Sequence, residues 1–336
     1  MTKINNSSRP LLSITIPTYN RAKYLDLCLT KICKQSKDAQ DIIEIVISDN
    51  CSTDNTEEVV YKYKNLGNNI LYTKNNKNLG IDGNIEKCFS LAKGKYVWIF
   101  SDDDILLDGI FNKIIQLLQN GEYGNVYLSN FWYSQDYVKE MPVQKSLFDF
   151  TIYKNQEDYL KKVNYWVTFC SGNITNKDII PKDFNSKKYL GTELTLVHWI
   201  LTASILSKEN VYVNTVSLAC KGGNSSGNYK FFTVFGTYLR SICFDVFKEY
   251  HISNSVIKYT DNRLLLHFFP NFIISYKRKR LEVFIEEDPK LVFYKEYKNN
   301  LIFWLLNYPL FYLPKKIDTL YLRIVKKIIQ PLLNFL

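Results

Sequence analysis

Residues 11–131 alternate between short apolar runs and stretches with helical spacing, and this alternation constrains the fold most strongly. The runs are rich in β-branched and aromatic residues and occupy 11–17, 42–48, 69–73, 96–100 and 125–131. Between them apolar residues recur three and four apart, and a helix after the third run is predicted to stop at Gly94. Strict alternation predicts βαβ units, and hence an α/β fold with a mostly parallel sheet flanked by helices.

Three polar loops follow the first, second and fourth runs: PTYNR at 17–21, SDNCSTD at 48–54 and SDDD at 101–104. Ligands of parallel sheets bind beyond the carboxyl ends of the strands. Because all three loops are predicted at that edge, we expect them to form one binding site.

Beyond residue 135 the alternation stops. The pattern predicts a strand at residues 165–176 and an apolar helix at residues 191–206 that begins with Glu193. The Gly- and Ser-rich stretch at 220–228 predicts a mobile loop. Helical aromatic segments and a basic tail follow.

The chain of 336 residues has a net charge of +10, with 12 Lys/Arg against 6 Asp/Glu in residues 271–336. This charge favours an anionic partner. Zinc-finger spacing and aromatic RNA-binding signatures are absent from the sequence, so we expect a membrane surface and no nucleic acid. Seven scattered cysteines without a C-x-x-C pair favour a reducing compartment. Without an apolar signal core at 1–10 or an apolar run of about 18 residues, we expect a cytoplasmic protein.

Asp102, Asp103 and Asp104 end the fourth run with three adjacent negative charges. Carboxylate oxygens are hard ligands that suit Mg²⁺ or Mn²⁺, and a bound ion would relieve their repulsion and bind phosphate oxygens. The alternative is a solvated acidic run before the helix at 108–119, where aspartates suit the helix dipole. Asp49 ends the second run in a similar loop, with a turn or cap as its alternative role.

Four motifs, SITIPTYNR, VISDNCSTDNT, NKNLG and WIFSDDD, occur in this order and resemble those of the GT-A glycosyltransferases of family 2. The resemblance covers residues 10–200. It implies a Rossmann-like nucleotide-binding fold and inverting transfer of a sugar from a nucleotide-sugar. It also implies a GT-A catalytic domain, which we expect at 1–220, with a nucleotide-sugar half at 10–131 and an acceptor half at 132–220. The helical aromatic segments and the basic tail make residues 221–336 a separate helical, basic region.

The resemblance implies roles for ten positions: Pro17, Thr18, Tyr19, Arg21, Asp49, Asn78, Gly80, Asp102, Asp103 and Asp104. The first three would line the nucleotide pocket, and Asp49 would contact the base. Asp102 and Asp104 match the D-x-D pair: Asp102 toward the ribose and the water shell of a Mn²⁺ or Mg²⁺ ion, Asp104 toward the metal and the diphosphate. A triple Asp permits two registers, so the role of Asp103 stays open.

Glu193 is the best match to the carboxylate that acts as the family's base, although only one acid is present where the family usually has a pair. The alternative is an N-terminal cap by Thr192 with Glu193 in the first helical turn. His198, five residues later, is either a buried structural histidine or a metal ligand. The family usually has an alanine-arginine-asparagine element after the third strand, and this sequence has GIDGNIEKC at 80–88 instead. In this region, therefore, the resemblance implies binding roles only for Asn78 and Gly80.

The segment 315–336 contains an amphipathic helix. Ile317, Leu320, Tyr321, Ile324, Val325 and Ile328 gather on one side, opposite Lys316, Arg323, Lys326 and Lys327. Such a helix can lie in an anionic membrane interface, and packing on the rest of the protein is the alternative. We predict that a second basic cluster, KRKR at 277–280, forms a solvent-exposed face.

The sequence therefore predicts a non-processive, metal-dependent glycosyltransferase of bacterial surface polysaccharide synthesis, since the Q-x-x-R-W motif of processive synthases is absent. The SDN variant and the SGNI segment resemble O-antigen transferases of the abequosyltransferase type. We expect a UDP-sugar donor, with a CDP-sugar possible, and a glycan or polyprenyl-linked acceptor at the inner face of the cell membrane. The alternatives are a sugar nucleotidylyltransferase and a non-catalytic glycan-binding partner.

Overall fold

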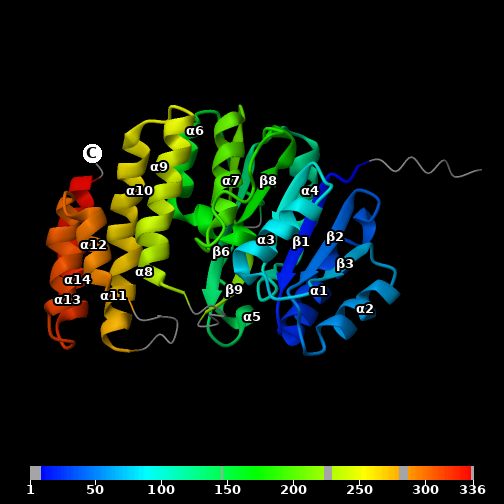
Figure 1. The fold of residues 1–336 in the computed structure, drawn as a ribbon, viewed down its shortest axis with the longest axis horizontal. Helices are drawn as coiled ribbons and strands as arrows, with labels where there is room; N and C mark the ends of the chain where they lie inside the picture. The colour runs from blue at the N-terminus through cyan, green and yellow to red at the C-terminus, as the bar shows by residue number, and fades with distance from the viewer. Residues whose placement is uncertain (1–8, 145–146, 223–228, 280–286, 334–336) are drawn as a thin grey trace, which may run out of the picture. The chain divides into compact units, whose positions relative to one another are not determined.

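The computed structural model describes residues 9–144, 147–222, 229–279 and 287–333. The chain divides into two compact units (Figure 1). The sheet unit comprises residues 1–191 and 195–222, and the helical unit comprises residues 192–194 and 223–336. The Gly- and Ser-rich stretch that was predicted to be a mobile loop lies mainly outside the described residues.

Nine strands in the described part of the sheet unit form one mixed sheet in the order β3-β2-β1-β4-β8-β6-β9-β5, with β7 beside β9. Their bounds are β1 Leu12–Thr18, β2 Ile43–Asp49, β3 Ile70–Lys74, β4 Tyr96–Ile99, β5 Ile105–Leu106, β6 Asn125–Tyr133, β7 Phe150–Tyr153, β8 Asn173–Asn176 and β9 Asn210–Lys221. The first four strands in this order are parallel neighbours, whereas β8 pairs antiparallel with both β4 and β6. The prediction of a mostly parallel sheet therefore holds for the N-terminal half, where the three polar loops follow their strands.

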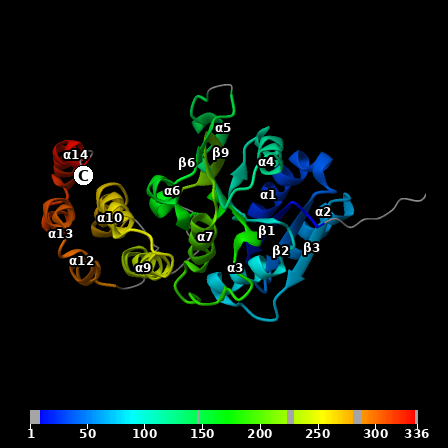
Figure 2. The same ribbon diagram turned by 90° about the horizontal axis from the view of Figure 1, so that it is seen from above.

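Helices cover both faces of this sheet (Figure 2). Helices α1, α2 and α4 lie on one face and α3 and α7 on the other. The helices are α1 Ala22–Gln35, α2 Thr56–Asn65, α3 Gly80–Leu91, α4 Ile110–Gln119, α5 Tyr137–Glu140, α6 Gln156–Val163 and α7 Thr195–Leu206, with 3-10 turns at Lys37–Ala39, Asn164–Thr168, Cys170–Gly172 and Lys177–Ile179. The main core, which includes Ile14, Leu25 and Phe111, lies on the side of α1, α2 and α4. On the other side the rings of Phe89 and Trp199 stack 4.3 Å apart.

Three local predictions are corrected. Only Asn173–Asn176 of the stretch predicted as one strand pairs in the sheet, because 3-10 turns occupy Asn164–Thr168 and Cys170–Gly172. Helix α7 starts at Thr195, four residues later than predicted, after two residues with positive φ. Helix α3 ends at Leu91, so Gly94 does not stop it; a Cβ atom at Gly94 would lie 2.6 Å from the Ser13 nitrogen.

The helical unit confirms the predicted C-terminal helical region. Its α-helices are α8 Phe231–Thr233, α9 Leu239–Glu249, α10 Asn254–Arg263, α11 Phe269–Lys277, α12 Pro289–Tyr297, α13 Tyr308–Tyr312 and α14 Asp318–Leu333. Within the described residues of this unit, three π-helical segments join or extend them: Val234–Tyr238, Leu264–Phe268 and Phe303–Asn307. Two of these end shortly before Pro270 and Pro309, which lack the backbone N–H that a regular helix would use.

Helix α14 packs on the helical unit through residues that were not assigned to its apolar face. Leu322 and Ile329 are buried, whereas Ile317, Leu320, Ile324 and Ile328 are exposed. At its start, Asp318 is buried and forms ion pairs with Lys277 and Arg278 of the KRKR cluster. These two cations are therefore structural, which corrects the prediction of a solvated face for them. Among the described residues, no helix combines the length and apolar character needed to cross a membrane.

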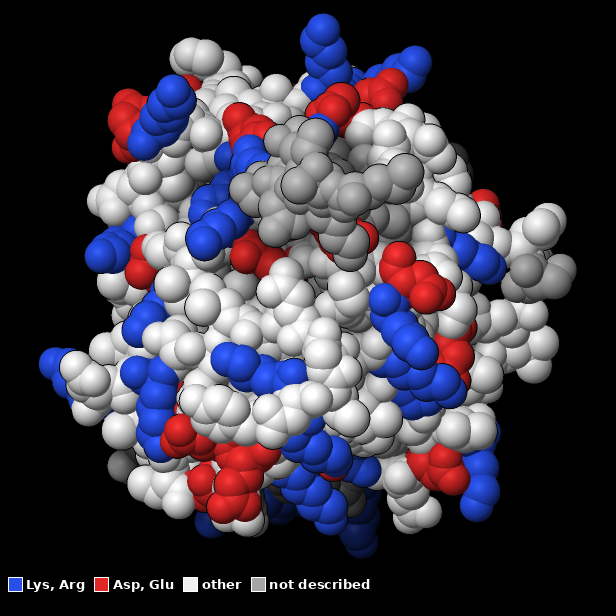
Figure 3. All heavy atoms as spheres, turned by 90° about the vertical axis from the view of Figure 1, so that its right-hand side faces the viewer, with Lys and Arg blue, Asp and Glu red and all other residues white. Residues whose placement is uncertain are grey.

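Charge is mixed on the face of the molecule that Figure 3 shows, where Lys and Arg side chains alternate with Asp and Glu. All seven cysteines are free thiols. The burial of Cys33 raises its pKa to about 12, so this thiol stays protonated near neutral pH.

Candidate functional site

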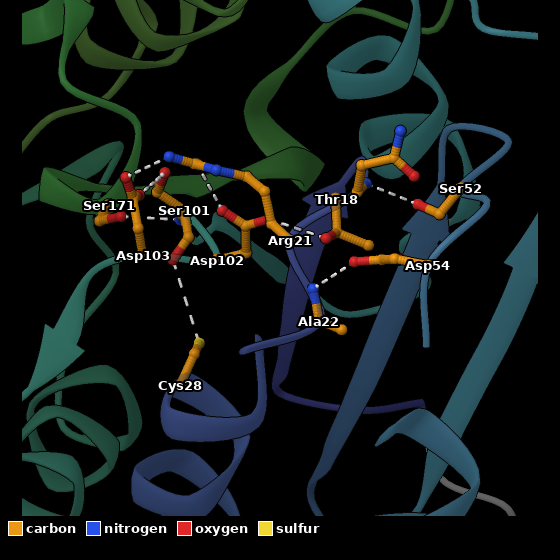
Figure 4. Close-up of polar contacts among 11 residues, drawn as sticks. Thr18, Arg21, Ala22, Cys28, Ser52, Asp54, Ser101, Asp102, Asp103 and Ser171 are labelled. Atoms are coloured by element: carbon orange, nitrogen blue, oxygen red, sulfur yellow. Dashed lines mark hydrogen bonds and ion pairs between the residues drawn. The ribbon is translucent and has the colours of Figure 1, made fainter. Parts of the chain in front are cut away.

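The loops after β1 and β4 meet at Asp102 (Figure 4). Thr18 Oγ1 donates a hydrogen bond to Asp102 Oδ2 at 2.7 Å, and Arg21 Nη1 donates to Asp102 Oδ1 at 2.8 Å. β1 lies directly beside β4 and both run in the same direction, so their carboxyl ends bring these loops together. The predicted convergence of PTYNR and SDDD is therefore present in the structure.

Arg21 also reaches the next carboxylate. Its Nη2 lies 3.0 Å from Asp103 Oδ2, and Ser101 Oγ donates to Asp103 Oδ1 at 2.8 Å. One guanidinium thus bridges two of the three adjacent aspartates and offsets part of their repulsion. The solvated acidic run offered as an alternative does not fit this arrangement, because Asp102 and Asp104 are buried.

Burial changes the protonation of the triplet. Loss of hydration raises the pKa of Asp102 to about 7, with repulsion from Asp103 adding to the rise and Arg21 opposing it. Burial likewise raises the pKa of Asp104 to about 7, again with a contribution from Asp103. A cation placed between these carboxylates would favour their charged forms, since an opposite charge stabilises an ionised acid.

Residues of β9 and of the 3-10 turn Cys170–Gly172, which precedes β8, support the acidic loop. Ser171 Oγ accepts a hydrogen bond from the Ser101 backbone nitrogen at 2.8 Å, and the Ser171 carbonyl accepts one from Trp98 Nε1 at 2.7 Å. The Asp104 side chain interacts with those of Ser171 and Cys220. Ser171 belongs to the SGNI segment, whose contribution to the site could not be derived from the sequence.

Asp49 lies beside Thr18 in the register of β1 and β2. It is fully buried, and its Oδ1 accepts from the Ser52 backbone nitrogen while its Oδ2 accepts from the Tyr72 hydroxyl, each at 2.7 Å. Burial and the neighbouring Asp49 raise the pKa of Tyr72. These bonds show that Asp49 shapes the turn of this loop. Its contact with the base of a bound nucleotide stays a prediction.

The segment Asn78–Gly80 is tied to the second loop by Asn50, a residue that was not singled out in the sequence. Asn50 Nδ2 donates to Asn78 Oδ1 at 2.8 Å and to the Gly80 carbonyl at 3.2 Å. Asn50 Oδ1 accepts from the Leu79 nitrogen at 2.8 Å. Of the remaining predicted pocket residues, Pro17 is half-buried at the end of β1 and Tyr19 is 44% exposed beyond it.

Glu193 precedes α7 and has a φ of +63°, a conformation that is rare for a residue with a side chain. It is therefore not in the first helical turn, which corrects the N-cap alternative. Gly191, two residues earlier, also has a positive φ, of +87°. Two left-handed residues so close together define a sharp turn, and strained turns of this kind are common at functional positions.

Asp82 of α3 holds both ends of this turn. Its Oδ2 accepts from the Gly191 backbone nitrogen at 2.8 Å, and its Oδ1 accepts from the Thr195 nitrogen at 3.1 Å. Asp82 is buried at 5% exposure, where charge-assisted bonds to backbone N–H groups are strong. The sequence analysis did not predict a role for Asp82. Its position in GIDGNIEKC, where the chain departs from the family pattern, could have pointed to it.

His198 lies on α7, away from the acidic loop in sequence and buried among aromatic rings. The ring centroids of Phe184 and Tyr189 are 4.2 Å and 4.9 Å from that of His198. This environment fits the structural alternative. In the part of the chain that the structure describes, no group of three or more His, Cys, Asp or Glu side chains is placed to hold a metal ion by itself.

Residues 13–180 match the sequence profile of Glycosyl transferase family 2. The chain belongs to this family. The match runs from β1 through β8 and includes the acidic loop. It confirms the predicted family, and it favours a glycosyltransferase over the nucleotidylyltransferase and non-catalytic alternatives.

Two curated relatives illustrate the range of this family. The chain is 50% identical over 97 residues to abequosyltransferase RfbV of Salmonella typhimurium, which covers 29% of each protein. It is 26% identical over 212 residues to the GalNAc(5)-diNAcBac-PP-undecaprenol beta-1,3-glucosyltransferase of Campylobacter jejuni, which covers 61% of this chain and 62% of the relative. The chain thus matches less than two thirds of the length of either relative.

Among solved structures, the fold is similar to that of S. aureus TarS 1–349 in complex with UDP. The TM-score is 0.57 at 17% identity, over 84% of this chain and 86% of that one. This likeness confirms the predicted GT-A fold class.

Proposed function

We propose that the protein is an inverting, metal-dependent, non-processive glycosyltransferase that acts in bacterial surface polysaccharide synthesis. The observation that carries this proposal is the meeting of Thr18 and Arg21 with Asp102, next to a second buried carboxylate, Asp104, at the carboxyl edge of the parallel strands. Family membership supplies the reaction class.

The residues present fit a divalent metal of the Mg²⁺ or Mn²⁺ type. Such ions are usually held by one or two protein carboxylates, with water and substrate phosphates filling the other positions. A site with two buried carboxylates suits that pattern. Asp102 and Asp104 would hold the ion. When bound, it would stabilise the negative charge that develops on a departing nucleoside diphosphate.

The protein's own groups would do the remaining work at the donor. Arg21 would place positive charge beside the diphosphate, and Thr18 would keep Asp102 oriented through its hydrogen bond. Pro17, Tyr19, Asp49, Asn78 and Gly80 would shape the nucleotide pocket, as the family resemblance implies.

Inversion requires a base on the face of the sugar opposite the leaving group, and we assign this role to Glu193. Its left-handed backbone and the fixed ends of its turn support the assignment, because a base must be held in one position relative to the acceptor hydroxyl. Glu193 would take the proton of that hydroxyl as its oxygen attacks the sugar.

A nucleotide-sugar donor is supported by family membership and by the UDP and UDP-GlcNAc complexes of the TarS neighbour. A UDP-sugar is favoured, and a CDP-sugar is the second class. For the acceptor, the name of the Campylobacter relative includes a PP-undecaprenol carrier, which supports a polyprenyl-linked glycan. Such an acceptor places the enzyme at the inner face of the cell membrane.

The direct test is an Asp104→Asn variant, which keeps the side-chain volume and removes the charge. We expect a loss of sugar transfer of at least about 100-fold, as for removal of a group that stabilises transition-state charge. Calorimetry with Mn²⁺ and UDP should show a matching loss of metal-dependent UDP binding. Asp108→Asn, four residues later and largely exposed, is the matched control and should retain wild-type activity. Retention of most activity by Asp104→Asn would refute the metal role.

A further inference from the structure

Helix α14 carries apolar side chains on two faces, and only one of them is covered. Leu322 and Ile329 are buried and Val325 is half-buried. The other face carries the outer row: Ile317, Leu320, Ile324 and Ile328, which are 44%, 58%, 51% and 60% exposed. Ile317 immediately precedes α14 and accepts a hydrogen bond from the Tyr321 nitrogen, so spacings of three and four residues align it with Leu320, Ile324 and Ile328. A contiguous exposed apolar row on a soluble surface marks an interaction site.

The exposure of the outer row does not come from a loosely attached helix. Asp318 in the first turn is fully buried and ion-paired with Lys277 at 3.6 Å, and it also pairs with Arg278. Arg278 donates a further bond to Thr319 Oγ1 at 3.1 Å. The Tyr321 hydroxyl donates to the Leu305 carbonyl. These contacts fix the rotation of α14, so the outer row faces solvent.

The charges around the outer row indicate what covers it. Lys316, Arg323 and Lys327 are exposed within four residues of the outer row, whereas Lys326 is half-buried and the single acid, Asp318, is buried. Residues 315–328 as a whole carry a net charge of +4, five cations minus one anion. A second copy of the same helix would bring like charge against like. An anionic lipid surface offers both an apolar layer for the aliphatic side chains and phosphate groups for the cations.

We infer that the outer row of α14, with its flanking lysines and arginine, is the surface by which the protein docks on an anionic membrane. The four aliphatic side chains enter the boundary between headgroups and acyl chains, and the cations bind the headgroups. This inference rests on the proposed function, because a polyprenyl-linked acceptor brings the enzyme to a membrane. It differs from a membrane span, since the helix lies in the interface.

The test compares flotation of the full-length protein with vesicles of phosphatidylglycerol and of phosphatidylcholine. A Leu320→Glu/Ile324→Glu variant should lose roughly tenfold in partitioning for each aliphatic side chain removed from the interface, or about 100-fold in total. The matched control is Leu66→Glu/Leu291→Glu, which adds the same charge at two positions that are 71% and 70% exposed elsewhere. We expect this control to float with phosphatidylglycerol vesicles almost as the wild type does.

The cations are tested separately with Lys316→Gln/Arg323→Gln/Lys327→Gln, which should remove the preference for phosphatidylglycerol and its salt dependence. The inference is overturned if Leu320→Glu/Ile324→Glu floats like the wild type, or if the control pair loses as much. It is also overturned if sedimentation shows a wild-type dimer that the variant breaks.

A water-soluble acceptor analogue separates this inference from the proposed function. Leu320→Glu/Ile324→Glu should transfer sugar to the soluble analogue at the wild-type rate and lose transfer only on vesicles. If neither protein transfers sugar to any acceptor while the wild type still floats, the proposed function fails and the docking surface stands.

Discussion

The guanidinium of Arg21 bridges Asp102 and Asp103, with 2.8 Å between Nη1 and Asp102 Oδ1 and 3.0 Å between Nη2 and Asp103 Oδ2. The side chain of Arg21 is only 15% exposed, so this bridge is partly shielded from water. The bridge joins the loop after β1 to the loop after β4 through opposite charges as well as through hydrogen bonds. A planar, two-pronged cation is well suited to hold two carboxylates at once.

We predict that Arg21→Gln weakens binding of a nucleoside diphosphate by roughly 10- to 100-fold, because loss of one or two charge-assisted bonds costs about 1.5–3 kcal/mol. The loss should be larger without a divalent ion, when the unbridged aspartates repel the phosphates most strongly. Arg21→Lys should recover only part of the affinity, since an ammonium cannot bridge both carboxylates.

Titration calorimetry with UDP, with and without Mn²⁺, measures both effects. Arg9→Gln is the matched control, because it removes the same charge from an exposed ion pair with Asp178. Equal affinities for Arg21→Gln and Arg9→Gln would mean that Arg21 has no direct part in diphosphate binding.

A second prediction concerns Asp82, which would act as a positioning residue for Glu193. Asp82→Asn keeps the shape but leaves one amide oxygen for the two backbone N–H groups of Gly191 and Thr195. We expect kcat to fall by about 10- to 100-fold with an unchanged KM for the donor, as for a misplacement near 1 Å. Hydrogen exchange at residues 191 and 195 should accelerate in the same variant.

Glu86→Gln provides the comparison, because Glu86 lies one turn along α3 with similar burial. Its carboxylate accepts from Ser186 Oγ at 2.8 Å and does not bond to the backbone at 191 or 195 in the hydrogen bonds described. If Glu86→Gln lowers kcat and thermal stability as much as Asp82→Asn does, Asp82 is only a structural anchor.

A third prediction tests the close approach at Gly94. A Cβ atom there would lie 2.6 Å from the Ser13 nitrogen and 2.9 Å from the Leu12 carbonyl carbon, both backbone atoms that cannot turn aside. We expect Gly94→Ala to lower the free energy of unfolding by about 3 kcal/mol through overpacking. Gly67→Ala, where the space is open but φ is +87°, should cost about 1 kcal/mol from backbone strain. Similar urea midpoints for the two variants would rule out the steric explanation.

A fourth prediction uses Asp261 in the helical unit. Burial raises its pKa from 3.8 to about 6, helped by Glu296 and opposed by Arg240. The native state therefore binds a proton more tightly than the unfolded state. The contribution of Asp261 to stability falls as pH rises from about 4 to 6, and it is constant above that range. Tyr297 and Cys243 also face this carboxylate but do not ionise between these pH values.

Urea denaturation between pH 4.5 and 7 measures this slope. Asp261→Asn should make the stability less dependent on pH in that window, whereas Asp245→Asn at an exposed position of α9 should leave the slope unchanged. An identical slope for Asp261→Asn and the wild type would contradict the prediction.

The N-terminal half of the sheet could be predicted because each strand and helix there shows its own local period. Predicted strands 11–17, 42–48 and 69–73 each lie within one residue of β1, β2 and β3. The later strands could not be predicted in the same way. β9 carries a register irregularity against β6 near Ser129, which breaks its alternation. Tyr165 and Val167 have side chains typical of strands, but they lie buried in the 3-10 turn Asn164–Thr168.

The sequence predicts which loops form the acidic site, but it does not predict the side-chain contacts that hold them. The order of the strands placed Thr18 and Asp102 at one edge, since that follows from parallel pairing. The bonds from Asp82 to Gly191 and Thr195 join residues more than 100 positions apart, and local spacing carries no information about such pairs. The same holds for the support that Ser171 gives to Ser101.

The two-faced character of α14 also has a practical consequence for handling the protein. Four aliphatic side chains exposed to buffer on a well-anchored helix make concentrated samples prone to stick to plastic, to resins and to one another. Lipid nanodiscs or a mild amphiphile should therefore give better-behaved preparations for crystallisation and kinetics than buffer alone.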